Sequence, residues 1–65
     1  MTTPTTFHAM FQREPDGRWI AEIPAVPGVY GSGLTIDEAR RALRQALAVF
    51  VDDADSAEIV EEISW

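Results

Sequence analysis

The sequence has no cysteine, no lysine and no apolar run long enough to cross a membrane. Without cysteine no disulfide can form, and a single histidine excludes a Cys/His cluster that would hold a structural zinc ion. The first eleven residues have no basic region and no apolar core, so they do not match a secretory signal. We therefore expect a cytoplasmic protein that makes no contact with a membrane.

The chain is also short. Its 65 residues are enough for one domain, which we take to span residues 1–65. A domain of this size buries only about 60% of the surface that its unfolded chain exposes. Small domains usually compensate with disulfides, a metal ion or assembly. Only assembly is open to this sequence, so we expect a homo-oligomer, either a dimer or a tetramer.

Positive charge is scarce. Five arginines face eleven carboxylates, and the formal net charge is −6. Contact with phosphates needs clustered cations, so we expect no direct nucleic-acid binding by this chain. The imbalance favours a basic protein partner, because attraction between opposite charges steers the encounter. The alternative is that the acidity only keeps a small protein soluble.

Two segments with alternating apolar residues predict a β-hairpin. Between them, Glu14-Pro15-Asp16-Gly17 predicts a type I turn followed by a glycine in the left-handed conformation. This loop pairs Phe11 with Ala21 and places the apolar residues of both segments on one face of the sheet. These residues are Phe7, Ala9 and Phe11 in the first segment, and Trp19, Ala21 and Ile23 in the second.

The remainder of the chain predicts a short strand, a helix and a final strand. Pro24 and Pro27 indicate a kink, after which residues 29–32 are expected to form a third strand. Thr35-Ile36-Asp37-Glu38 is a capping box, and apolar residues at helical spacing extend the helix over residues 36–51. Asp37 and Arg41 are spaced for an i,i+4 ion pair.

Alternating residues from 59 to 65 predict the last strand. A right-handed crossover through the helix would make this strand parallel to its neighbour. The predicted fold class is therefore α+β, with β-β-β-α-β order and a small, mainly antiparallel sheet that carries one helix on one face.

The order of these motifs resembles the HicB-like antitoxin family. The family pattern has a D-G turn, an aromatic strand, P-x-x-P-G, a glycine-flanked strand and T-x-x-E-A at the start of a helix. The corresponding segments here are Asp16-Gly17, Trp19, Pro24–Gly28, Gly31 with Gly33, and Thr35–Ala39. The resemblance covers residues 7–51 and implies a fold like a truncated ribonuclease H.

The resemblance also implies a function, that of the antitoxin in a type II toxin–antitoxin system. Such a protein binds and neutralises a small basic HicA-like toxin that cleaves messenger RNA. Many family members add a C-terminal segment that binds operator DNA. This chain ends at Trp65, after the last predicted strand, so we expect it to lack that activity. The alternative is an orphan HicB-like module, without a toxin, that mediates oligomerisation or binds a small ligand.

The candidate partner-binding residues fall into two groups. One is an acidic C-terminal stretch suited to electrostatic steering. The other consists of apolar residues, of which Met10 and Ile20 are expected on the sheet face away from the helix. The acidic stretch could equally be a solvated turn and a charged edge strand that resists aggregation, and Tyr30 could equally cover the sheet edge. The candidates are Asp52, Asp53, Asp55, Glu58, Glu61 and Glu62, together with Met10, Ile20 and Tyr30.

No motif predicts catalysis. A ribonuclease H-like fold invites a search for the carboxylate cluster that two-metal hydrolysis needs. The inward positions of the first strand are apolar, and helix capping accounts for Asp37 and Glu38. His8 has no evident serine, cysteine or metal partner. We therefore expect no enzyme activity, no metal and no cofactor.

Overall fold

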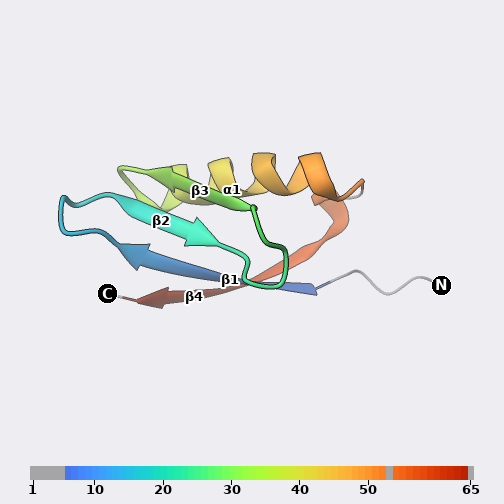
Figure 1. The fold of residues 1–65 in the computed structure, drawn as a ribbon, viewed down its shortest axis with the longest axis horizontal. Coiled ribbons are helices and arrows are strands. Elements are labelled where there is room, and N and C mark those ends of the chain that lie inside the picture. Colours follow the sequence, from blue (N-terminus) through green and yellow to red (C-terminus); the bar gives the residue numbers. More distant parts are fainter. Residues whose placement is uncertain (1–5, 53, 65) are drawn as a thin grey trace.

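The computed structural model describes residues 6–52 and 54–64. The strands form one mixed sheet in the order β3-β2-β1-β4, and α1 lies on one face of this sheet against β3 and β2 (Figure 1). The predicted α+β class and β-β-β-α-β order are confirmed. The elements are β1 (Thr6–Arg13), β2 (Trp19–Glu22), β3 (Tyr30–Gly33), α1 (Ile36–Phe50), a 3-10 turn η1 (Ala54–Ser56) and β4 (Glu58–Ser64).

The β1–β2 hairpin has the predicted register, with Phe11 opposite Ala21. In the turn, the Glu14 amide donates to the Arg18 carbonyl at 2.7 Å, and the Gly17 amide donates to the Glu14 carbonyl at 2.9 Å. Gly17 has a φ of 94°, which is the left-handed conformation that the loop requires. The turn residues therefore determine which side chains of both strands face the helix.

Two consecutive turns connect β2 to β3. The Val26 amide donates to the Ile23 carbonyl at 3.0 Å, and the Val29 amide donates to the Val26 carbonyl at 3.2 Å. The second turn contains Pro27 and then Gly28, whose φ is 93°, as a type II turn requires. Because Val29 closes this turn, β3 begins at Tyr30, one residue later than predicted.

The start of α1 follows the predicted capping box closely. The Thr35 hydroxyl accepts a hydrogen bond from the Glu38 amide at 3.1 Å. The Glu38 carboxylate accepts from the Leu34 amide at 2.7 Å, one residue before the expected cap amide. The helix ends at Phe50 rather than Val51, a difference within the usual uncertainty of a helix end.

Strand β4 is parallel to β1, as the crossover argument predicted, with His8 opposite Val60. Its other side has no partner strand among the described residues, so β4 is an edge of the sheet. The core lies between the sheet and α1, where the inward side chains of β1 and β2 meet those of the helix. The buried residues are Ala9, Phe11, Trp19, Ala21, Ile23, Val29, Ala39, Leu43, Leu47 and Ala54.

Two glycines in β3 allow α1 to approach the sheet closely. A Cβ atom on Gly31 would lie 2.4 Å from the Leu43 amide nitrogen and 2.8 Å from the Ala42 Cβ. A Cβ atom on Gly33 would lie 2.4 Å from the Glu38 Cβ. Real side chains cannot occupy such positions, so the helix rests directly on the backbone of β3.

Replacing Gly31 with alanine should therefore destabilise the fold. The added methyl group collides with helix backbone, which cannot rotate out of its way as a side-chain tip could. We expect the free energy of unfolding to fall by about 1–3 kcal/mol, the usual range for overpacking. Urea unfolding followed by circular dichroism measures this loss.

Ser32→Ala is the matched control, because Ser32 lies in the same strand and is exposed on the opposite face. It should change stability by no more than about 0.5 kcal/mol. Equal stability of the Gly31→Ala and Ser32→Ala proteins would contradict the close approach of α1 to β3.

Candidate partner-binding face

The sheet face opposite α1, called here the open face, has no described element packed over it. Its side chains come from alternate positions on all four strands. None of them belongs to the buried core, and all are exposed or half-buried. They are Thr6, His8, Met10 and Gln12 of β1, Ile20 and Glu22 of β2, Tyr30 and Ser32 of β3, and Glu58, Val60, Glu62 and Ser64 of β4.

One row of side chains crosses the whole open face. Met10 is opposite Glu22 on one side and opposite Glu62 on the other, and Glu22 is in turn opposite Tyr30. Adjacent strands lie about 4.8 Å apart, so this row alternates apolar and acidic side chains within contact distance of each other. The register thus brings Met10, Tyr30 and Glu62, which were predicted separately, into one line and adds Glu22.

Met10 is the centre of this face. Ile20 and Val60 lie on its two diagonals, since Gln12 is opposite Ile20 and His8 is opposite Val60. Diagonal neighbours are about 7–8 Å apart, within reach of long side chains. Val60 is 45% exposed and was not among the predicted residues. Only the parallel register of β4 against β1 reveals that it belongs here.

The open face carries negative charge that no described cation neutralises. Its strand positions include three carboxylates, on Glu22, Glu58 and Glu62, and no arginine. None of the three takes part in an ion pair within residues 6–52 and 54–64. A basic partner could therefore approach them without first breaking a salt bridge of this chain.

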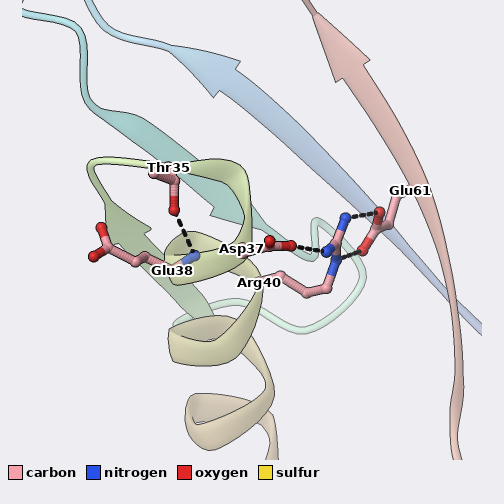
Figure 2. A network of polar contacts seen from close by, with 5 residues as sticks. All are labelled: Thr35, Asp37, Glu38, Arg40 and Glu61. Carbon is pink, nitrogen blue, oxygen red and sulfur yellow. Dashed lines mark hydrogen bonds and ion pairs between the residues drawn. The ribbon is translucent and has the colours of Figure 1, made fainter.

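Glu61 lies on the other face of the sheet, where it binds α1. The Arg40 guanidinium donates through Nε and Nη2 to the two carboxylate oxygens of Glu61, and the Nη2 bond is 2.8 Å long (Figure 2). Hydrogen bonding to Glu61 raises the pKa of Arg40 above its ordinary value, although partial burial opposes the shift. The ion pair connects α1 to β4 and separates Glu61 from the predicted acidic surface.

The predicted pair between Asp37 and Arg41 is wrong. Asp37 instead accepts a hydrogen bond from Nη1 of Arg40 at 2.5 Å, in i,i+3 spacing (Figure 2). Arg40 is half-buried and already directed towards β4 by Glu61, which leaves its Nη1 atom near Asp37, whereas Arg41 is exposed. Tertiary contact thus selects one of two spacings that are equally suitable on an isolated helix.

The predicted acidic stretch does not form one surface. Asp52 is exposed in the turn after α1, whereas Glu58 and Glu62 are on the open face. Asp53 and Trp65 lie outside the described residues, and only the backbone of Asp55 is described, within η1. Alternation along β4 is the reason for the division, because consecutive residues of a strand point to opposite faces.

Neither a metal-binding cluster nor a membrane-spanning helix is found among the described residues. In ranges 6–52 and 54–64, no three histidine, aspartate or glutamate side chains are grouped so that they could hold a metal ion. The described part of the chain also has no helix that is long and apolar enough to span a membrane.

Removal of the Arg40–Glu61 pair should lower stability modestly. Both side chains are partly exposed, at 35% and 23%, so solvent screens their attraction. We expect Glu61→Gln to lower the free energy of unfolding by about 0.5–1 kcal/mol, the upper part of the range for exposed pairs, because the contact is bidentate.

Glu62→Gln is the control for this substitution. It removes the same charge from the next residue, which has no described ion-pair partner. Urea unfolding at low ionic strength should show little change for this variant. If both variants lost equal stability, the Arg40–Glu61 pair would have no specific structural role.

Comparison with known proteins places this chain in a family. The UPF0150-like family model matches residues 7–52, the stretch that includes the hairpin, the glycine-containing strand and the helix. The UPF0150 protein ssr1258 of Synechocystis is 29% identical over 49 residues, which cover 75% of this chain and 71% of that protein. No solved structure matches the chain significantly. Since the family model covers well over half of the sequence, the chain belongs to the UPF0150-like family.

Proposed function

We propose that this protein is an antitoxin, which binds and neutralises a small basic toxin that cleaves messenger RNA. Family membership supports the proposal, because the UPF0150-like family is related to HicB-like antitoxins. The matched residues, 7–52, nearly coincide with residues 7–51, which carry the resemblance to those antitoxins. The toxin would be a HicA-like protein, and binding would be stoichiometric.

The observation that carries the proposal is the character of the open face. It combines apolar side chains at Met10, Ile20 and Tyr30 with the carboxylates of Glu22 and Glu62, which have no ion-pair partner among the described residues. Tyr30 is 66% exposed, so a large aromatic surface is available for contact. Aromatic and methionine side chains are enriched at protein interfaces, and carboxylates around them would select lysine and arginine.

Each part of the face would contribute differently to neutralisation. The net charge of −6 would steer a basic toxin towards the protein. After encounter, Met10 and Tyr30 would exclude water, while Glu22 and Glu62 would pair with cations that the toxin otherwise uses to bind RNA. The toxin would then be inhibited by occlusion, a mechanism that requires no catalytic group on this chain.

Charge reversal on the open face tests the proposal. The partner for calorimetric titrations at low and high salt is the product of the neighbouring gene, which the proposal requires to be a short, lysine-rich protein. The unaltered protein should bind with fixed stoichiometry and more weakly at high salt. We expect Glu22→Lys/Glu62→Lys to weaken binding at low salt at least tenfold, because attraction becomes repulsion at two positions.

Asp52→Lys combined with Glu14→Lys is the matched control. It makes the same change in net charge at residues outside the open-face strands. Loss of affinity restricted to the open-face variant would support the proposed surface. Equal loss in both variants would show that only net charge matters. No binding at either salt concentration would contradict the antitoxin function and favour an orphan module.

A further inference from the structure

We propose that two copies of this chain associate by antiparallel pairing of their β4 strands about a two-fold axis at Glu61. Strand β4 has seven residues and pairs on one side only, with β1, within the described chain. The other side presents backbone donors and acceptors that a second strand can satisfy. Helix α1 packs over β3 and β2, the half of the sheet away from β4, and leaves the β4 edge accessible (Figure 1).

Symmetry restricts the possible registers. A two-fold axis perpendicular to the sheet keeps each face of one copy continuous with the same face of the other. Residues directly opposite in an antiparallel pair point to the same face. The axis must therefore lie midway between the two copies of one residue, so that this residue is opposite itself. Registers centred on Val60, Glu61 or Glu62 keep at least five residues of each strand paired.

The register centred on Glu61 is the most complementary of the three. It pairs all seven residues of β4, because Glu61 is the midpoint of Glu58–Ser64. On the helix face it brings Ile59 opposite Ile63 of the partner copy, twice. Both isoleucines are half-buried in a single chain and would gain apolar cover.

Side chains on the open face distinguish the registers further. Centring on Glu61 places each Val60 opposite a Glu62 and each Glu58 opposite a Ser64. Centring on Val60 would place Glu58 opposite Glu62 twice, and centring on Glu62 would place that residue opposite itself. Like charges directly opposite one another destabilise a sheet. In neither of these alternatives do the described strand positions of the open face supply an arginine near the opposed carboxylates.

Arg40 makes the Glu61 register possible. This register sets two Glu61 side chains opposite each other, which alone would be unfavourable. Each is already held by two hydrogen bonds from the Arg40 of its own chain. Two guanidinium groups would therefore accompany the two carboxylates at the axis. The same ion pair that joins α1 to β4 thus neutralises the midpoint of the edge strand.

Engineered cysteines can test the register directly, since the protein has no cysteine of its own. Opposite residues in antiparallel strands have Cα atoms about 4.5–5.5 Å apart, within disulfide range. A mixture of Val60→Cys and Glu62→Cys proteins, equilibrated in a glutathione redox buffer, should form the mixed disulfide at least tenfold over either homodimer. Gln45→Cys, exposed on α1, should form less than a tenth as much disulfide.

Alternative products overturn the proposal in recognisable ways. A dominant Val60→Cys homodimer would mean a register centred on residue 60, and a dominant Glu62→Cys homodimer one centred on residue 62. Disulfide yields no higher than that of Gln45→Cys would show that β4 does not pair with a second copy.

Light scattering on the unaltered protein provides an independent measurement. We expect a mass twice the 7.2 kDa of one chain. Two copies with a net charge of −6 each repel, so the dimer should dissociate less at 500 mM salt than at 50 mM. Binding of a basic partner has the opposite salt dependence, which separates the two proposals. A monomer at both salt concentrations would contradict the β4 interface and leave the open-face proposal untouched.

Discussion

The structure depends most on the contact between helix α1 and the backbone of β3. Gly31 and Gly33 have no side chains, and a Cβ atom at either position would overlap the helix. Because α1 rests on this edge of the sheet, Leu43 and Leu47 reach the inward side chains of the β1–β2 hairpin. All of the buried apolar surface then lies on one side of the sheet, and the opposite side stays uncovered.

Alternation along β4 divides the acidic residues between two roles. Glu61 faces α1 and is held by Arg40, so it joins the helix to the far edge of the sheet. Glu58 and Glu62 face the other way and have no described ion-pair partner. One strand therefore carries both an internal ion pair and a charged surface. A partly exposed ion pair that solvent screens stabilises a fold only modestly.

Local sequence was sufficient to predict much of this fold. Glu14–Gly17 determines the hairpin register through its own hydrogen bonds, and Thr35 with Glu38 determines where α1 begins. Residues whose role depends on distant pairing could not be placed in this way. Three features depend on the register of β4 against β1, two strands that a long crossover connects. They are the pairing of Arg40 with Asp37, the position of Glu61 on the helix face, and the position of Val60 on the open face.

The central claim is that function resides on the uncovered face of the sheet. Nuclear magnetic resonance of the isotope-labelled protein, titrated with the product of the neighbouring gene, which the account requires to be basic, tests it most directly. The account predicts that amide shifts concentrate at Met10, Glu22, Tyr30 and Glu62, in the row that crosses all four strands. Shifts concentrated instead on the outer side of α1, around Arg41, would contradict it.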